Sequence, residues 1–281
     1  MKLTARILRT ISQHRIKLLI HLSAFSLALL TVLTLPAMWC GRNAETWMRE
    51  DLSTQLQFSR GVEEAVVDNQ LLRESFKTGS DQFNGEWLFG SYLMAGTGFA
   101  QIALQRNSSS ERHERLTRQC IEKILTPEVR AFDKNRWQED PLNKGIESPN
   151  HHAAYLGYLN FLLGLYHLAF EKDTFADLNE RITTSLVRGL RNNHIGLLES
   201  YPEEMYPVDN CFVLGSIALY QQVADKDYSR LIQECTEKLR KNYMHPERKL
   251  LFQSVNPANG TPVDAPRGSG SAFGIVPLHY A

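Results

Sequence analysis

The chain has 281 residues, of which 43% are hydrophobic and 22% charged, and its 31 basic residues balance its 31 acidic ones. This composition is typical of an ordinary globular protein, and a net charge of zero argues against a nucleic-acid partner. The four cysteines form no CxxC pair, so we expect neither a metal site nor a cofactor. Oxidation could join Cys120 to Cys235, although buried free thiols on helices fit both positions better.

The first 40 residues predict a membrane segment. Basic residues before position 18 precede an apolar run, Leu18 to Trp39, which contains no Asp, Glu, Lys or Arg. About 20 apolar residues span a bilayer, and a basic flank stays in the cytoplasm. We therefore expect a cytoplasmic segment at 1–17, a transmembrane signal anchor at 18–40, and a domain at 44–281 on the periplasmic or extracellular side.

Two alternatives to the signal anchor remain open. A cleaved signal peptide would have an unusually long basic segment of 17 residues before a long apolar run. A lipoprotein would use Cys40, but the preceding Trp39 is bulky where a small residue is wanted.

After the anchor, nearly every segment has a helical pattern. The first predicted helix runs from Ala44 to Phe76, with a break near Asp68. Apolar helices rich in small residues then alternate with amphipathic helices in three pairs: 86–104 and 111–125, 151–170 and 175–191, and 208–223 and 228–243. We further expect a loop at 126–149, a short strand at 250–255 and a last helix from Gly268.

This alternation predicts an all-α fold with two layers of helices. Inner helices of an α/α barrel are apolar on all sides, whereas outer helices need only one apolar stripe. The pattern favours an (α/α)6-barrel-like fold, although an α-solenoid has the same alternation. A full barrel needs twelve helices and about eight follow the anchor, so we expect a barrel that is incomplete at its C-terminus.

Four segments carry a family resemblance: Trp137–Lys144 (WQEDPLNK), Tyr155–Tyr166 (YLGYLNFLLGLY), Pro207–Val213 (PVDNCFV), and Met244–Phe252 (MHPERKLLF) followed by Asn256–Gly260 (NPANG). Their order and spacing over about residues 80 to 281 resemble the linalool dehydratase/isomerase family. The resemblance implies an (α/α)6 barrel with its pocket at the mouths of the inner helices.

The chain departs from this family at the residues credited with its chemistry. Tyr158 stands where the family has a histidine in its Tyr-x-Gly-His-Leu-Asn helix. Tyr206 and Gly215 stand where the family has cysteines before and after its Asp-Asn pair, and Cys211 matches neither position. The resemblance therefore implies the barrel and the pocket, but not thiol and imidazole chemistry on terpene alcohols.

Two carboxylates are the first candidates for catalysis. Asp209 lies between a turn-rich loop and an apolar helix, beside Tyr206 and Phe212, where its pKa would be raised for a role as general acid. The plain alternative is a helix N-cap. Glu86 at the start of the first inner helix would be its partner, as in inverting glycoside hydrolysis, or would only stabilise the helix N-terminus.

The start of the second inner helix offers further candidates. His151, Tyr155 and Tyr158 follow helical spacing, so we expect them to share one face as a polar pocket wall. We name His152 and Tyr158 as catalytic candidates and Tyr155 as a substrate-binding one. The alternative is a histidine-rich helix start with tyrosines in the core, and a metal site lacks a clear third ligand.

Four further residues complete the predicted substrate-binding set. Asp264 and Arg267 lie in a polar loop before the last helix, where Arg267 would bind a carboxylate or phosphate unless the loop is only a capped turn. Tyr206 flanks Asp209. Trp87 would be a stacking platform, as would Trp137, although core packing suits both tryptophans better.

These residues point to an enzyme without establishing one. The leading hypothesis is a membrane-anchored barrel that performs acid/base chemistry on a hydroxylated small molecule, through hydration, dehydration or isomerisation. One alternative is a glycosidase-like barrel with paired carboxylates. The other is a non-catalytic binding or scaffold barrel that lost its catalytic groups.

Overall fold

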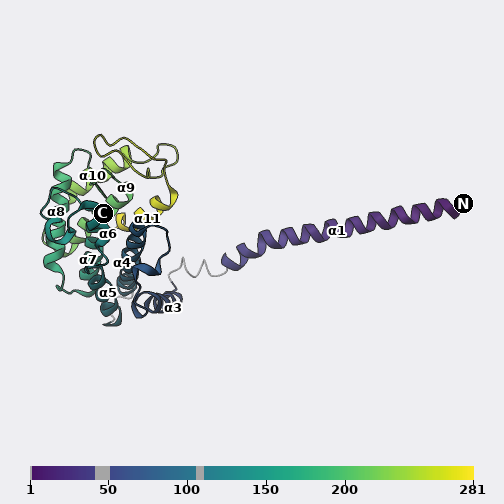
Figure 1. Cartoon of the computed structure of the whole chain (residues 1–281), viewed down its shortest axis with the longest axis horizontal. Coiled ribbons are helices and arrows are strands. Elements are labelled where there is room, and N and C mark those ends of the chain that lie inside the picture. The colour runs from purple at the N-terminus through teal and green to yellow at the C-terminus, as the bar shows by residue number, and fades with distance from the viewer. Residues whose placement is uncertain (1, 42–50, 106–110) are drawn as a thin grey trace. The chain divides into compact units, whose positions relative to one another are not determined.

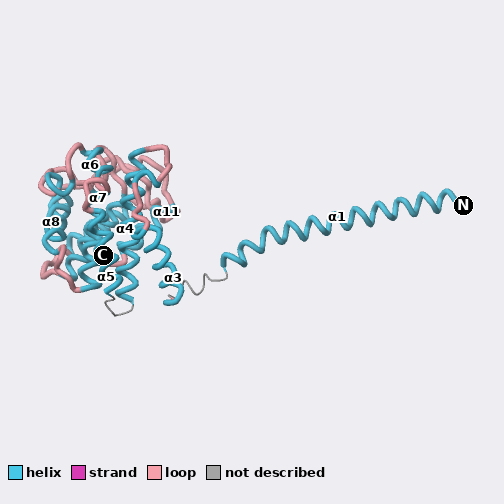
Figure 2. Tube along the Cα trace, turned by 60° about the horizontal axis from the view of Figure 1, so that its bottom comes forward, coloured by secondary structure: helices cyan, strands magenta, loops and turns pink. Residues whose placement is uncertain are grey.

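The computed structural model describes residues 2–41, 51–105 and 111–281. The chain contains two compact units, Met1–Phe58 and Ser59–Ala281. Within the described residues the ordered elements are helices, and isolated bridges are the only β pairing (Figure 2). The prediction of an all-α protein is confirmed, whereas the predicted helix start at Ala44 lies outside the described residues.

Helix α1, Lys2–Gly41, is the main element of the first unit. Its segment Arg15–Gly41 has a mean hydropathy of 2.2 and is long and apolar enough to cross a membrane. His21 Nδ1 lies 2.8 Å from the carbonyl four residues earlier, and the Thr31 and Thr34 hydroxyls each donate to such a carbonyl. These bonds give the polar side chains of the helix hydrogen-bond partners that lipid would not provide. The helix is therefore compatible with the predicted anchor.

A short helical segment leads into the second unit. Helix α3, Leu52–Val62, continues into the π-helix η1, Glu63–Asp68, and a 3-10 turn η2 follows at Arg73–Ser75. Asn69 and Gln70 form a turn in which Gln70 has a φ of 47°. The predicted break near Asp68 is therefore confirmed.

The second unit has two layers of helices, which Figure 1 shows in its teal, green and yellow parts. Neighbouring helices of the inner layer pack in the order α4, α7, α9 and α11, and α5, α8 and α10 lie against them. The inner helices are Asp81–Gln105, Ala153–Phe170, Pro207–Val223 and Gly268–Leu278; the outer ones are Glu111–Ile124, Ala176–Asn192 and Ser229–Asn242. The predicted pairs of apolar and amphipathic helices are all present.

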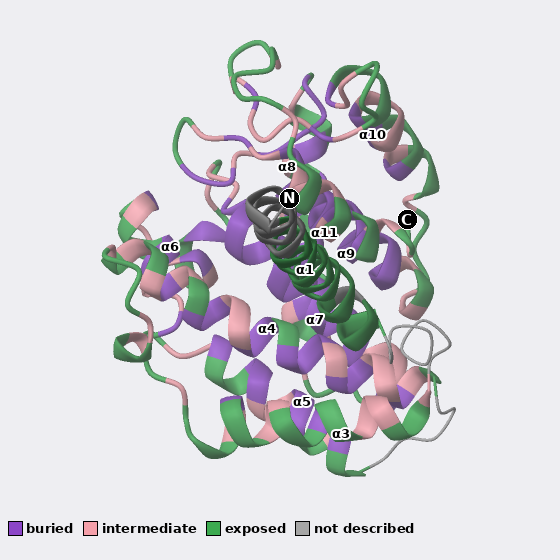
Figure 3. Ribbon diagram, turned by 90° about the vertical axis from the view of Figure 1, so that its right-hand side faces the viewer, coloured by how far each residue is buried: buried purple, intermediate pink, exposed green. Residues whose placement is uncertain are grey.

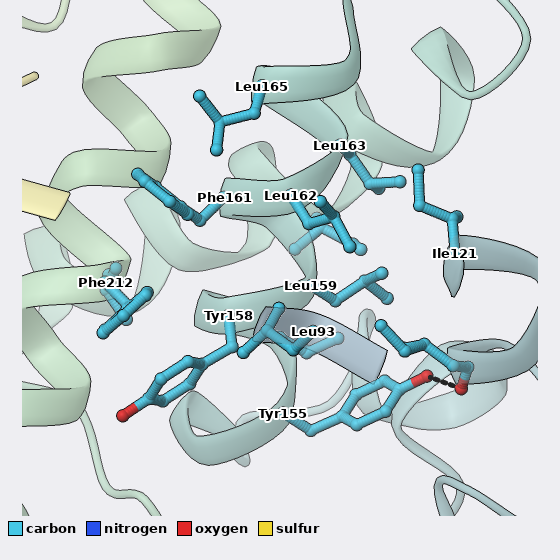
Figure 4. Close-up of a cluster of buried hydrophobic side chains, with 14 of the residues drawn as sticks. Leu93, Ile121, Tyr155, Tyr158, Leu159, Phe161, Leu162, Leu163, Leu165 and Phe212 are labelled. Atoms are coloured by element: carbon cyan, nitrogen blue, oxygen red, sulfur yellow. Dashed lines mark hydrogen bonds between the residues drawn. The ribbon is translucent and has the colours of Figure 1, made fainter. Parts of the chain in front are cut away.

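Helix α7 lies at the centre of the core (Figure 3). It is also long and apolar enough to cross a membrane, but 83% of that stretch is buried inside the protein, which identifies a core helix. Figure 4 shows that the Tyr155 and Tyr158 hydroxyls point apart, and Tyr155 donates to the Ile124 carbonyl at 3.0 Å. His151 precedes the helix. The expectation that these three residues share one face was wrong, because the helix begins only at Ala153.

A buried polar network joins α7 to α8 and α9. Asn160 donates to the Thr183 and Ser216 hydroxyls at 2.9 and 3.1 Å, and its side-chain oxygen accepts from Asn179 at 2.7 Å. All four side chains are buried. Because unpaired buried polar groups are costly, the network selects one register for the three helices.

Glycines allow the inner helices to approach each other closely. A Cβ on Gly157 of α7 would lie 2.8 Å from Val213 Cγ2 of α9. A Cβ on Gly215 of α9 would lie 2.4 Å from the carbonyl oxygen of Pro277 in α11. Gly157 and Gly215 are therefore required by the close contact between neighbouring helices.

Gly215→Ala is expected to lower the free energy of unfolding by about 1–3 kcal/mol, because α11 must move to admit the methyl group. Gly90→Ala on α4 is the matched control, since a Cβ there meets nothing within 4 Å. That control should gain roughly 0.5–1 kcal/mol from helix propensity. Urea denaturation measures both, and equal effects would contradict the close contact.

The structure corrects two predictions about the loops. The predicted loop at 126–149 contains helix α6, Ala131–Trp137, and the π-helix η3, Pro141–Gly145. Helix α6 has only seven residues, too few for a periodic pattern. The predicted strand at 250–255 makes isolated bridges instead, including two with Pro262 and Pro266, which lack the N–H that a ladder needs. Cys120 and Cys235 are buried free thiols, as expected, and Cys211 is a third.

Candidate functional site

Asp209 lies in the first turn of α9, two residues after Pro207 begins the helix. The N-cap is Tyr206, so Asp209 does not occupy the cap position. Its Oδ1 accepts a hydrogen bond of 2.7 Å from the Tyr158 hydroxyl of α7, and Ser200 donates a second. The side chain is 9% exposed. The carboxylate therefore faces side chains of neighbouring segments, and not the amides of its own helix.

Burial raises the pKa of Asp209 to about 6. The hydrogen bonds from Ser200 and Tyr158 act in the opposite direction, and the negative charge of Glu86 raises the pKa further. A carboxyl group with this pKa exchanges its proton near neutral pH, which suits a general acid or base.

Glu86 brings a second carboxylate from the first turns of α4. It is half-buried and accepts hydrogen bonds from the Tyr201 hydroxyl at 2.7 Å and from Gln82 at 3.0 Å. Burial raises the pKa of Tyr201 well above its usual value, and the charges of Glu86 and Asp209 add to the effect. We call Asp209, Tyr158, Glu86 and Tyr201 the carboxylate–tyrosine cluster, since each carboxylate accepts from one tyrosine and the two pairs interact electrostatically.

The loop before α9 is held by the Asn that follows Asp209. Asn210 Oδ1 accepts from the Leu198 amide at 2.7 Å, and its Nδ2 donates to the Leu198 carbonyl at 3.0 Å. The Ser200 amide donates to the Glu204 carbonyl at 2.8 Å, which closes the turn. The Asp-Asn pair thus has two roles: Asn210 fixes the loop that carries Ser200 and Tyr201, and Asp209 accepts a hydrogen bond from Ser200, while Tyr201 donates to Glu86.

Helix α6 and the same loop form a charged rim beside the cluster. Arg136 pairs with Glu204, and its guanidinium lies 4.8 Å from the centre of the Tyr201 ring. The Tyr206 hydroxyl donates to Glu204 at 2.8 Å. Tyr206 was predicted to bind substrate, whereas Arg136 and Glu204 were not predicted. Arg136 lies on α6, a helix that was itself not predicted.

Aromatic rings from α4, α9 and α11 surround Tyr158, and the Phe89 ring of α4 lies 6.3 Å from it. Its ring stacks on Phe212 of α9 with centroids 4.0 Å apart, and Phe273 of α11 lies 6.1 Å away (Figure 4 shows the first two rings). Burial, followed by the charge of Asp209, raises the pKa of Tyr158 well above its usual value. The hydroxyl therefore stays protonated and keeps donating to Asp209.

His152 lies in a different cluster. It is fully buried, with Nδ1 2.5 Å from Asp133 and Nε2 3.1 Å from Glu139, and the Trp137 ring covers it at 4.8 Å. Its backbone has a left-handed φ of 48°. Both ring nitrogens are engaged by carboxylates, so this arrangement ties α6 and the following loop to the start of α7.

The cluster around His152 shifts two carboxyl pKa values in opposite directions. Burial raises the pKa of Asp133, and the hydrogen bond from His152 only partly offsets this. Partial burial would raise the pKa of Glu139 too, but hydrogen bonds from His152, Ser148 and Asn150 hold it below its usual value.

The structure places the remaining predicted residues away from the carboxylate–tyrosine cluster. Trp87 is 60% exposed, so the expected core packing was wrong for it, whereas Trp137 is buried as expected. Asp264 is exposed and accepts from Ser254 at 2.6 Å, and Arg267 is exposed beside Gln253. Tyr155 is fully buried and bonds a backbone carbonyl of the core, as its structural alternative proposed.

Asp209→Asn is expected to stabilise the folded protein at neutral pH. Because the folded pKa of Asp209 is raised to about 6, the protonated folded state is favoured, and that stabilisation is lost as pH rises from about 4 through 6. Asparagine does not ionise, so between pH 4 and pH values above 6 the variant should gain about 3 kcal/mol of stability relative to the wild type. Urea denaturation at several pH values measures the free energy of unfolding of both proteins. A difference between them that stays constant from pH 4 to 8 would contradict the prediction.

The described residues contain no group of three or more His, Cys, Asp or Glu side chains that could hold a metal ion. No protein-family model matches the chain, and no match is found among characterised proteins. A proposal about the chemistry of this site therefore rests on the contacts of Asp209 and Glu86.

Proposed function

We propose that the unit Ser59–Ala281 is an enzyme that performs acid/base chemistry on a neutral, hydroxylated small molecule, by hydration, dehydration or isomerisation. One observation carries the proposal. Asp209 is a buried carboxyl group with a pKa of about 6 that accepts a hydrogen bond from Tyr158 and interacts electrostatically with a second carboxylate, Glu86. Residues whose burial and charged neighbours perturb the pKa in this way are favoured at catalytic sites.

The two carboxyl groups can divide the reaction between them. Protonated Asp209 would give its proton to the substrate hydroxyl, and the C–O bond would break with its electron pair leaving on water. Ionised Glu86 would take a proton from the neighbouring carbon, and the electrons of that C–H bond would form the C=C bond. The reverse sequence adds water. If the departed water instead adds to the other end of an allylic cation and returns its proton to Asp209, the hydroxyl group has moved.

The charges around the site support a neutral substrate. Glu86, Glu204 and Asp209 are acidic, and the guanidinium of Arg136 beside them is already paired with Glu204. An anionic substrate would meet uncompensated negative charge on reaching Asp209. The hydroxyl groups of a neutral substrate can instead form hydrogen bonds with the carboxylates and with the hydroxyl groups of Tyr201 and Tyr206.

The inner layer supports the proposed relation to the linalool dehydratase/isomerase family. Helices α4, α7, α9 and α11 would form part of an (α/α)6 barrel, and the order of the four matching segments agrees with it. At the family's histidine position Tyr158 bonds Asp209, and at one cysteine position Gly215 lies against Pro277. The chemistry proposed here therefore rests on carboxyl groups, whereas the family's thiols have no counterpart. We further propose that α1 is a signal anchor with this unit on the non-cytoplasmic side.

Glycosidic cleavage is the second candidate function. The electrostatic interaction between Glu86 and Asp209 favours it, because inverting glycosidases use one carboxyl with a raised pKa and one ionised carboxylate. The same residues would act, with water as the nucleophile activated by Glu86.

A substrate screen tests the proposal and separates its two forms. The full-length chain in detergent is incubated with allylic alcohols and with glycosides, beside a Glu86→Gln/Asp209→Asn double variant. Turnover of an alcohol by the wild type alone supports the lyase or isomerase form, and turnover of a glycoside supports the second form. Equal products from both proteins would reject catalysis and favour a binding barrel.

A further inference from the structure

A polar cavity lies outside the carboxylate–tyrosine cluster, between α8 and the loop before α7. Its volume is about 120 Å³. At about 30 Å³ per water molecule, this is room for roughly four waters or a ligand of four to five heavy atoms. The chain at 148–151 forms one wall, and Leu186 and Leu198 supply apolar surface.

Arg188 brings a positive charge to this cavity. Its Nη2 donates to the Ile146 carbonyl at 2.8 Å and contacts the Ser185 hydroxyl at 3.3 Å. Among the described residues Arg188 forms no ion pair, so its charge meets only neutral partners. Its remaining N–H groups are free to bind an oxyanion in a planar, two-pronged manner.

His151 supplies a neutral donor to the same cavity. Its Nδ1 accepts a hydrogen bond of 3.3 Å from the Glu199 amide, so the hydrogen of the neutral ring is on Nε2. Burial, with a contribution from His152, lowers the pKa of His151, which keeps the ring neutral. Only glycine fits at position 189 without displacing its neighbours in the cavity wall. A Cβ on Gly189 would lie 3.1 Å from His151 Cδ2 and 3.0 Å from Leu198 Cδ2.

Acidic neighbours limit the charge that the cavity can accept. The Glu199 carboxylate lies 4.0 Å from His151 Nδ1, the nitrogen that also accepts from the Glu199 amide. Glu139 accepts a hydrogen bond of 2.8 Å from Asn150, which lines the cavity. Direct pairing with the Arg188 guanidinium can hold an anion of a single charge, whereas the two nearby carboxylates repel a phosphate dianion more strongly.

We propose that this cavity binds a short-chain carboxylate. The ligand's carboxylate would pair with the Arg188 guanidinium and accept from His151 Nε2, and its aliphatic end would rest on Leu186 and Leu198. The site is separate from Asp209 and Glu86, and the proposal does not depend on the function assigned to them.

Calorimetric titration of the full-length chain in detergent at low salt tests this site with propionate, inorganic phosphate and 1-propanol as probes. We expect saturable propionate binding that is weakened at least tenfold in Arg188→Gln and unchanged in Arg191→Gln, an exposed arginine on the same helix outside the cavity. Phosphate and propanol should bind more weakly than propionate to the wild type.

A second variant keeps the test decisive if Arg188→Gln fails to fold. Gly189→Ala retains the guanidinium but narrows the cavity, so it should also weaken propionate binding. The proposal is overturned if propionate shows no saturable binding, if phosphate binds more tightly, or if propionate binds the Gly189→Ala variant as tightly as the wild type.

Discussion

Asp209→Asn is expected to lower kcat/KM by about 10²–10⁴-fold on any substrate that the wild type turns over, the range for loss of a general acid or base. Asparagine keeps the size of the side chain and can still accept from the Tyr158 hydroxyl, which donates at 2.7 Å. It cannot deliver a proton. The loss should therefore appear in kcat, with an unchanged fold by circular dichroism.

The matched control is Asp177→Asn, which changes an Asp that is 88% exposed on α8 beside Arg181. Its activity should equal that of the wild type. A surviving kcat/KM in Asp209→Asn would remove Asp209 from the mechanism and leave its raised pKa as a property of burial alone.

His152→Leu is expected to lower the free energy of unfolding by about 3–5 kcal/mol, because it leaves two carboxyl groups, one of them fully buried, without their hydrogen-bond partner. The Asp133 carboxylate, which is fully buried, and Glu139 would both lose a partner. Trp137 would also lose the ring that it covers at 4.8 Å. Urea denaturation measures the effect.

His167→Leu provides the comparison, because His167 is 27% exposed and lies 3.8 Å from a largely exposed Asp173. It should cost less than about 1 kcal/mol, as expected for a surface pair. If His152→Leu leaves stability intact but abolishes turnover, His152 belongs to the catalytic machinery and its structural role is rejected.

Much of the helical architecture was predictable from sequence because the alternation of apolar and amphipathic segments repeats three times. Such repetition constrains which helices are inner and which are outer. The approach of Tyr158 to Asp209 depends on α7 packing directly on α9, where Gly157 faces Val213. The sequence could name both residues but could not establish that contact.

Some residues were predicted wrongly or not predicted at all. At these positions the local backbone conformation determines where the side chain points. Trp87 follows Glu86, but neighbouring helical residues point in different directions, so one joins the cluster and the other is exposed. Arg136 depends on the short helix α6. His152 has a left-handed backbone that no pattern of apolar residues indicates. Tyr201 reaches Glu86 from a position 115 residues away, through a loop fixed by Asn210.

The central claim is that Asp209 is a carboxyl group whose proton equilibrium lies near neutral pH. Carbon-13 NMR of the labelled side chain, assigned by its loss in Asp209→Asn, measures that equilibrium directly. We predict a titration midpoint near pH 6. In Tyr158→Phe we predict a higher midpoint, because the hydroxyl stabilises the ionised form. A midpoint near 4 that does not change in Tyr158→Phe would contradict the account.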